Sequence, residues 1–258
     1  MATMRIRSVA SFVSMLTTCI ALVAFAAGCG GGPRLRYRHE FSLAPGQQHH
    51  AGLAKALLIP LDYANSEPIK GLNVSNEKIA ALIVTHLESK GITVERIDPA
   101  RFRDVADEAY RAVLAERKAG ASGVVSSRIE LGDVVPRIVE KLETRSDLVV
   151  SANVVMRTGE WNGGSTLVWD GVRRRDRTAG AGATTGTSPG SSLEVALHAP
   201  DGARVFSGYG GLDLVFQFNL QKKIMEIRPT LLQDESNLAE GVCVAFYPYF
   251  GMEEYCNR

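Results

Sequence analysis

The chain has 258 residues, of which 45% are hydrophobic and 22% are charged, a composition typical of a folded globular protein. Its 29 Lys and Arg residues nearly balance its 28 Asp and Glu residues, which argues against nucleic acid as a partner because nucleic-acid-binding domains present a basic face. Beyond the N-terminal 28 residues the sequence contains no second apolar run long enough to cross a bilayer.

The first 28 residues have the three zones of a secretory signal peptide. Arg5 and Arg7 supply a short positive region, residues 9–27 are almost wholly apolar, and small residues end the segment directly before Cys29. Removal of this leader would leave 230 of the 258 residues, with 27 basic residues against 28 acidic ones. Two other interpretations stay open: an uncleaved transmembrane anchor, and an ordinary signal that is cut after a small-residue site.

Cys29 stands in a pattern similar to the lipobox of bacterial lipoproteins, whose usual form is Leu, two small residues and Cys. Here Ala26 takes the place of Leu, and Ala27 and Gly28 follow it. The resemblance implies a diacylglyceryl group on the Cys29 sulfur and an acyl chain on the new amine, with no other cofactor. Three such chains would anchor the protein stably, because each buried CH₂ contributes about 0.8 kcal/mol.

The membrane is expected to be the outer membrane, with the protein at its periplasmic face. Residue 30 is Gly and not Asp, the residue that resembles an inner-membrane retention signal in enteric bacteria. A flexible Gly-rich tether follows Cys29 and ends at Pro33. The partners expected from this layout are the membrane, through the lipid, and a protein of the cell envelope.

Two of the four cysteines remain for the folded domain when Cys19 leaves with the leader and Cys29 carries lipid. In an oxidising periplasm, Cys243 and Cys256 are predicted to form a disulfide. It would close a loop of roughly 14 residues and contribute about 3 kcal/mol in the chain-entropy model. The alternative is a buried free thiol at Cys243 and a loose tail residue at Cys256. No His lies near either cysteine at metal-ligand spacing, so no metal site is predicted.

The first half of the chain predicts strands and helices in alternation. Strands are expected at residues 54–61 and 92–97, from a continuous apolar run and an alternating stretch, and a third at 123–131. One helix is predicted from an N-cap at Ser75 to Gly91. A second is predicted from Asp98 and Pro99 to Gly120, since Asp and Pro suit the cap and the first helical position.

The second half predicts β-hairpins. Residues 148–157 and 165–172 read as strands joined by a Gly-rich turn, and residues 193–198 and 204–207 as strands joined by a Pro-Asp-Gly turn. Apolar residues then alternate on one face from Leu212 to Leu220. A last helix is expected to begin at Asp234 or Ser236 and to end near Tyr247, before Pro248.

These elements predict an α/β fold: a two-layer sandwich in which about three helices pack against a mixed β-sheet with hairpins. The predicted segments are a signal peptide at 1–28, a lipidated tether and N-terminal extension at 29–53, a periplasmic domain at 54–250 and a C-terminal tail at 251–258. A flexible insertion is expected near 173–191, where several arginines are followed by a stretch composed mostly of Ala, Gly, Thr and Ser.

No catalytic motif is found, so no catalytic residue is predicted and the chain is not expected to be an enzyme. Serine-hydrolase and phosphate-loop spacings are absent from the sequence. Two features could contact a partner. Arg173, Arg174 and Arg175 form a dense basic cluster that suits an anionic partner, or that simply begins a solvated loop. Trp161 lies in a predicted turn and is the best candidate for an exposed aromatic contact.

The pattern of elements resembles a group of periplasmic lipoproteins, which includes the amino-terminal domain of TolB, the curli-secretion lipoprotein CsgG and the lipoprotein activators of penicillin-binding proteins. The matching stretches are residues 56–62, 79–98, 119–130, 205–208 and 238–250. Residues 133–191 depart from the group. The resemblance implies a sheet whose first strand ends at a proline and whose last helix packs back onto it.

The expected function is that of a membrane-tethered periplasmic lipoprotein, acting as a non-enzymatic binding or assembly factor in the cell envelope. Two alternatives stay open. The first is a subunit of an oligomeric secretion channel. The second is an envelope hydrolase whose catalytic groups are distant in the sequence.

Overall fold

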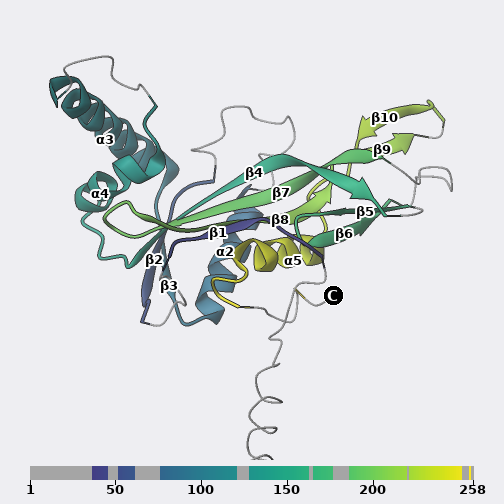
Figure 1. Ribbon diagram of the computed structural model, residues 1–258, viewed down its shortest axis with the longest axis horizontal. Coiled ribbons are helices and arrows are strands. Elements are labelled where there is room, and N and C mark those ends of the chain that lie inside the picture. The colour runs from purple at the N-terminus through teal and green to yellow at the C-terminus, as the bar shows by residue number, and fades with distance from the viewer. Residues whose placement is uncertain are drawn as a thin grey trace, which may run out of the picture. The chain divides into compact units, whose positions relative to one another are not determined.

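The computed structural model (Figure 1) describes eight parts of the chain: residues 37–45, 52–61, 76–120, 128–162, 165–176, 186–219, 221–251 and 256. The predicted leader, Cys29 and residues 177–185 of the predicted insertion lie outside the described residues. A search of the described helices for one long and apolar enough to span a membrane finds none.

The main sheet has eight strands and is mixed, as the sequence predicts. Six of them follow one another in the order β1 (Phe41–Leu43), β8 (Arg204–Leu214), β7 (Thr187–His198), β4 (Leu148–Trp161), β2 (Lys55–Leu58) and β3 (Thr93–Arg96). Strand β2 runs parallel to both β3 and β4, and the other pairs are antiparallel. The predicted α/β class is therefore confirmed.

Helix α2 (Asn76–Ser89) connects the parallel strands β2 and β3. Parallel neighbours need such a crossover, because a tight turn reverses the chain direction. The helix ends where the sequence predicts: Gly91 has φ of +79° and donates its backbone N–H to Glu88 O at 2.9 Å. This left-handed conformation costs glycine little, so the chain can turn sharply into β3.

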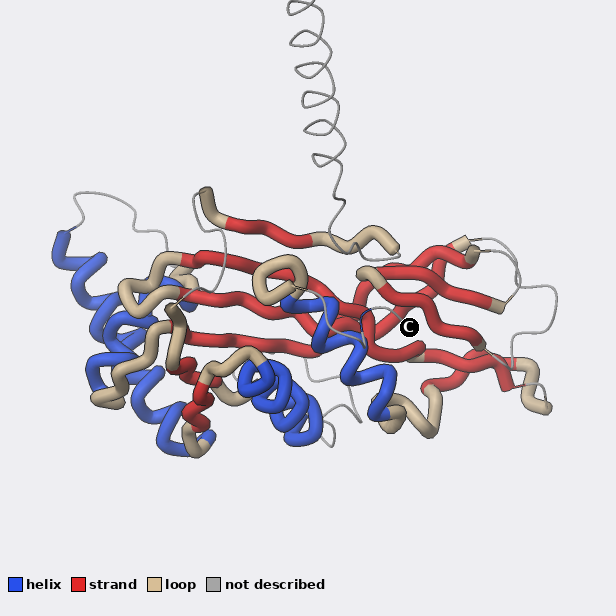
Figure 2. Tube along the Cα trace, turned by 90° about the horizontal axis from the view of Figure 1, so that it is seen from below, coloured by secondary structure: helices blue, strands red, loops and turns tan. Residues whose placement is uncertain are grey.

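Two pairs of helices cover opposite faces of the sheet. Helices α2 and α5 (Glu235–Phe246) bury the face that carries Ala56 and Leu58, and Figure 2 shows both lying across the strands. Helices α3 (Pro99–Gly120) and α4 (Leu131–Lys141) cover Leu57 and Ile59 on the other face, because successive strand residues point to opposite sides. Four helices thus take part, and α3 and α4 cover only one end of their face.

Helix α5 lies directly on the backbone of β8. A Cβ atom at Gly210 would come within 1.9 Å of Gly241 O, and one at Gly208 within 2.5 Å of Ala245 O. Neither position could therefore accept a side chain without moving the helix. As predicted, α5 begins after Asp234, whose carboxylate accepts the backbone N–H of Asn237 at 3.1 Å.

Two further hairpins extend from one end of the main sheet. Strands β5 (Thr166–Trp169) and β6 (Val172–Arg175) are joined by Asp170 and Gly171, both with positive φ. This two-residue Asp-Gly turn matches the twist of paired strands. Strands β9 (Phe216–Asn219) and β10 (Ile224–Ile227) form a separate two-stranded sheet after β8.

The predicted third strand at 123–131 is wrong where the structure describes it. Residues 128–130 form no strand, and α4 begins at Leu131. The backbone N–H of Glu130 donates to Asp133 Oδ2 at 2.8 Å, which is a helix N-terminal cap. The sequence does not predict this helix, because Gly132 and Pro136 are both poor helix formers.

The predicted pairing of residues 148–157 with 165–172 is also corrected. Strand β4 pairs with β5 only through Glu160 and Trp161. Its long partner is β7, which pairs with β4 from Val149 to Glu160. The predicted hairpin between residues 193–198 and 204–207 is confirmed within β7 and β8.

Cys243 and Cys256 are joined by a disulfide, with their Cα atoms 5.8 Å apart. Both are buried in a cluster that also contains Leu167, Trp169 and Val172 of the β5–β6 hairpin. The bond thus ties the chain near its C-terminus to α5, and it is compatible with the pair expected from the sequence.

Candidate functional site

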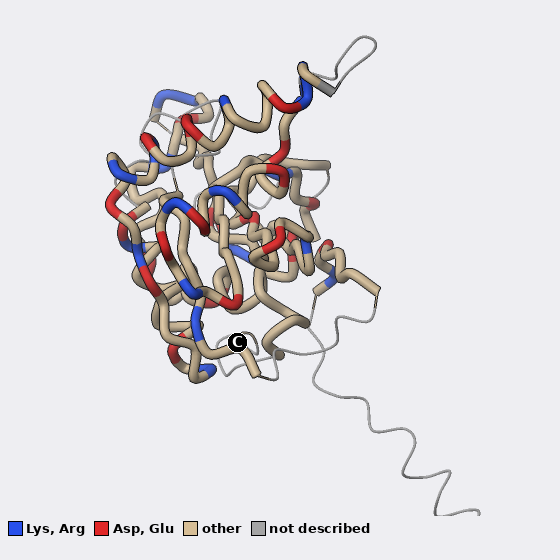
Figure 3. The backbone as a smooth tube through the Cα atoms, turned by 90° about the vertical axis from the view of Figure 1, so that its left-hand side faces the viewer, with Lys and Arg blue, Asp and Glu red and all other residues tan. Residues whose placement is uncertain are grey.

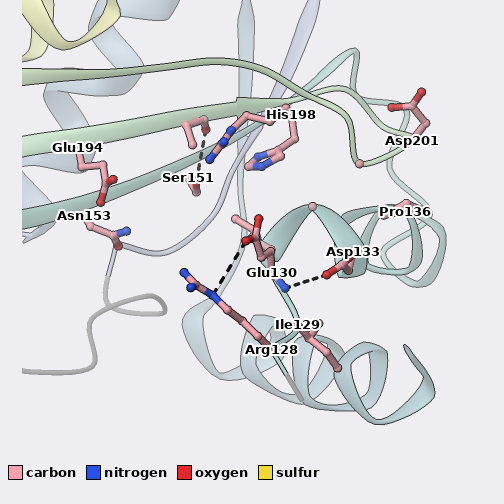
Figure 4. A pocket seen from close by; sticks show the side chains of 15 residues that line it. Arg128, Ile129, Glu130, Asp133, Pro136, Ser151, Asn153, Glu194, His198 and Asp201 are labelled. Atoms are coloured by element: carbon pink, nitrogen blue, oxygen red, sulfur yellow. Dashed lines mark hydrogen bonds and ion pairs between the residues drawn. The ribbon is translucent and has the colours of Figure 1, made fainter. Parts of the chain in front are cut away.

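A polar groove of about 810 Å³ lies where α3 and α4 stop covering the sheet (Figure 4). Its floor is formed by β4 and β7, and its walls by the start of α4 and the turn between β7 and β8. The side chains that line it include those of Arg128, Glu130, Asp133, Ser151, Asn153, Glu194, Ala196, His198, Asp201 and Arg204. We call this cavity the groove.

A second cavity of about 360 Å³ adjoins the groove and is more apolar. The two share Ile129, Glu130, Leu131, Ser151 and Asn153. The second cavity adds Ile59, Val134 and Tyr110, whose side chain is exposed. One continuous depression therefore offers a polar part and an apolar part, the mixture typical of binding sites.

The floor of the groove follows from the alternation of residues in β4 and β7. Asn153 opposes Glu194, and Ser151 opposes Ala196, across antiparallel strands. Their neighbours Ala152, Val154 and Val195 point to the other face and are buried beneath α2 and α5. A strand with one polar and one apolar side can leave its polar side uncovered at little cost, because that side needs no burial.

A chain of polar contacts continues from the groove along this open face. The Tyr209 hydroxyl donates to Glu194 Oε1 at 2.7 Å. Burial, together with this bond to a carboxylate, raises the pKa of Tyr209 to about 12. The Arg157 guanidinium lies 4.3 Å from the centre of the Tyr209 ring and forms ion pairs with Glu40 at 2.8 Å and Asp170 at 3.2 Å. These contacts fix the polar side chains in place before any partner arrives.

The wall formed by α4 is held against the β7–β8 turn by a backbone contact. A Cβ atom at Gly202, which has φ of +90°, would come within 2.1 Å of Gly132 O. Only glycine fits there, because its φ is left-handed and the space is closed. In the first turn of α4, Asp133 forms an ion pair with Arg117 at 2.7 Å, so the wall is tied to α3 as well.

His198 is the most buried titratable group of the groove, with 5% of its surface exposed. Among the described residues, no hydrogen-bond partner contacts its Nδ1 atom. Burial, and secondly the charge of Arg204, lower the pKa of His198, so the imidazole is neutral at pH 7. A neutral imidazole offers one hydrogen-bond donor and one acceptor.

The structure separates the residues that the sequence singles out for partner contact. Arg174 is 6% exposed, and its guanidinium donates to Leu212 O at 2.9 Å and pairs with Glu240 at 2.5 Å. It is an internal group and cannot meet a partner. Arg173 and Arg175 point to solvent, and Trp161 is half-buried at the end of β4, packed on the cluster that holds the disulfide. None of these residues lines the groove.

Sequence patterns do not reveal the groove, because its residues come from four separated segments. The available signal was the alternation in residues 151–154 and 193–198, which shows two-sided strands with a polar face. Nothing in the sequence shows that α4 stops short of that face. Charges of both signs are interspersed over the α3 and α4 end of the molecule (Figure 3). Among the described residues, no three His, Cys, Asp or Glu side chains gather closely enough to hold a metal ion.

No family model matches the chain, and no curated protein matches it significantly. A solved structure from Helicobacter pylori, described as a homologue of a neuraminyllactose-binding hemagglutinin, matches at 12% sequence identity. The alignment covers 87% of this chain and 99% of the other, with a TM-score of 0.34. A TM-score this low does not establish a shared fold.

Proposed function

We propose that this protein is a lipid-anchored envelope protein that binds a partner without catalysing a reaction. The lipid would be carried by Cys29, at the periplasmic face of the outer membrane. The partner would be a protein of the envelope, as in the group of TolB-like, CsgG-like and activator lipoproteins that the sequence resembles.

The observation that carries the binding role is the groove in an uncovered polar sheet face. Three of its acidic side chains are held by residues outside the groove: Glu194 accepts from Tyr209, Asp133 pairs with Arg117, and Asp201 accepts the backbone N–H of Ala203 at 3.0 Å. Groups that are fixed in this way favour recognition, because a preorganised surface loses little conformational entropy on binding.

The anchor is tested by intact mass and N-terminal fragmentation of protein extracted from bacterial membranes. A chain that begins at Cys29 and carries diacylglyceryl and acyl mass supports the proposal. An unmodified chain that begins elsewhere contradicts the anchor, and the groove then has to be judged alone.

The binding role is tested by photo-crosslinking in the envelope. A photoreactive residue replaces Ala196 on the floor of the groove, and a matched variant replaces Ala81, an exposed residue of α2 on the opposite face. We expect one envelope protein to be crosslinked from position 196 and not from position 81. The same pattern from both positions, or no crosslink from either, would contradict a partner at the groove.

A further inference from the structure

The β9–β10 hairpin has one apolar face on which Phe216 and Phe218 are half-buried and Met225 and Ile227 are exposed. Phe216 opposes Ile227 and Phe218 opposes Met225, so these four side chains share one face of the two-stranded sheet. Met225 is 53% exposed and Ile227 is 47% exposed. None of the four belongs to the three buried clusters of the protein.

The other face carries three polar side chains together with Ile224, which is also exposed, and the tip of the hairpin is polar. Gln217 and Asn219 each donate to Glu226 Oε1 at 3.1 Å. The tip carries Lys222 and Lys223, both exposed. An apolar face bordered by lysines is the arrangement of interfacial membrane segments, in which apolar groups enter the lipid and cations meet anionic headgroups.

The hairpin is suited to resting in a membrane surface and not to crossing a membrane. Each strand has four residues, which span about 14 Å at the rise of a β-strand, whereas the hydrocarbon core of a bilayer is about 30 Å thick. Apolar groups on so short an element can enter only the headgroup and outer acyl region.

The hairpin lies at the end of the sheet at which the described chain begins. Strand β1 runs antiparallel to β8, and its preceding residues continue toward the end of β8: Tyr209 N donates to Glu40 O, and Gly171 N to Arg38 O. Strand β9 follows directly after β8, as Figure 1 shows. Cys29 precedes the first described residue, Tyr37, by only eight residues, a reach of at most about 28 Å.

We propose that the apolar face of the β9–β10 hairpin docks on the surface of the lipid bilayer to which the protein is anchored. The hairpin would then be a second membrane contact that fixes the orientation of the domain, in addition to the lipid. This inference rests on the proposed lipid anchor at Cys29, which brings a bilayer within reach of the hairpin.

The test measures membrane contact at Met225 in the full, processed chain. Met225→Cys is labelled with a nitroxide, and the protein is reconstituted in vesicles of phosphatidylethanolamine and phosphatidylglycerol. The matched control is Met156→Cys on β4, a methionine of similar exposure (46%) on the main sheet. We expect the label at 225 to become more accessible to oxygen and less accessible to a water-soluble nickel complex when vesicles are added, and the label at 156 to stay aqueous.

The outcomes separate this inference from the anchor. If mass analysis shows the lipid but both labels stay aqueous, the hairpin proposal is overturned and the anchor stands. If the lipid is absent, flotation of the labelled chain with the same vesicles decides: a lipid-facing label at 225 in the floated protein supports the hairpin, and failure to float overturns it. Immobilisation of the label without access to oxygen would indicate a protein partner and also overturns the proposal. Ile227→Cys replaces Met225→Cys if that variant does not fold.

Discussion

Neighbouring residues in β4 and β7 meet two different surroundings. On one side of the sheet, Val154 and Val195 are buried beneath helices α2 and α5, and α5 approaches the backbone of β8 so closely that glycine is required. On the other side, Asn153 and Glu194 line an open groove. Alternate residues of the same strands therefore line a tightly packed core and an open groove.

This difference shows how a sheet can leave part of one face open and still be stable. The covered side stabilises the strands, because burial of its apolar side chains removes them from water. The open side is then free to carry polar groups that stabilise the fold little. Substitutions on the two sides should accordingly differ in how far they lower the free energy of unfolding.

The largest loss of stability is expected where α5 rests on the backbone of β8. Gly210→Ala should lower the free energy of unfolding by about 3 kcal/mol or more, because the new Cβ would overlap Gly241 O and force the helix away. The control is Ser207→Ala on the open side of β8, which should change it by less than about 0.5 kcal/mol. Urea denaturation measures both. Equal stability of the two variants would mean that α5 does not rest on the β8 backbone.

Arg174 tests a charged pair on the covered side. Arg174→Ala should cost about 3 kcal/mol, because it leaves Glu240 with an unpaired charge in a mostly buried position. Its exposed neighbour provides the control, since Arg173→Ala should cost less than about 0.5 kcal/mol. A similar small loss in both variants, measured by the same denaturation, would restore Arg174 to the candidate contact surface.

The wall of the groove is tested at Gly202. Gly202→Ala should cost about 2 kcal/mol, from its left-handed φ and from the overlap with Gly132 O. Gly186→Ala separates these two causes: Gly186 has φ of +105° but no atom near its missing Cβ, so it should show the backbone cost alone, about 1 kcal/mol. If the two variants melt at the same temperature, the contact between α4 and the turn contributes nothing.

The smallest effect is expected from pH at the groove. Burial lowers the pKa of His198 below its value in the unfolded chain, so the unfolded state binds more protons as the pH falls through the ordinary range of histidine. The folded protein should therefore be less stable at pH 5.5 than at pH 7.5, and His198→Gln should reduce that loss. Some loss of stability at pH 5.5 should remain in His198→Gln, because burial lowers the pKa of His39 as well. Melting curves at the two pH values would contradict this if His198→Gln left the difference unchanged.

Local patterns predict much of this fold and little of the groove. Helices α2, α3 and α5 follow from their caps and apolar stripes, with Gly91, Asp98 and Asp234 at the positions where the sequence places ends. Helix α4 does not, because Gly132 and Pro136 lower its helix propensity and are explained only by the turn at Gly202 that they contact. The groove depends on that tertiary contact, so a single sequence could not show it.

Arg174 shows the same limit for charged residues. Its neighbours in the sequence are basic and exposed, and a run of arginines ordinarily indicates a solvated surface. In β6, alternation turns Arg174 alone inward, where carbonyl oxygens of β8 and α5 and the carboxylate of Glu240 surround it. The alternation of residues in β6 can be predicted from the sequence. That α5 packs on the side of β6 to which Arg174 points cannot.

Strand β1 gives the molecule a defined mechanical response. It is only three residues long, it lies at the edge of the sheet beside β8, and it is the first strand of the described chain. A force that pulls the chain away from Tyr37 onward would load the Arg38–Gly171 bond, the His39–Tyr247 bond, the Glu40–Arg157 ion pair and the pairs of β1 one after another. Bonds that break in sequence resist less than bonds that shear together, so β1 would peel away at low force and leave the domain beneath it intact.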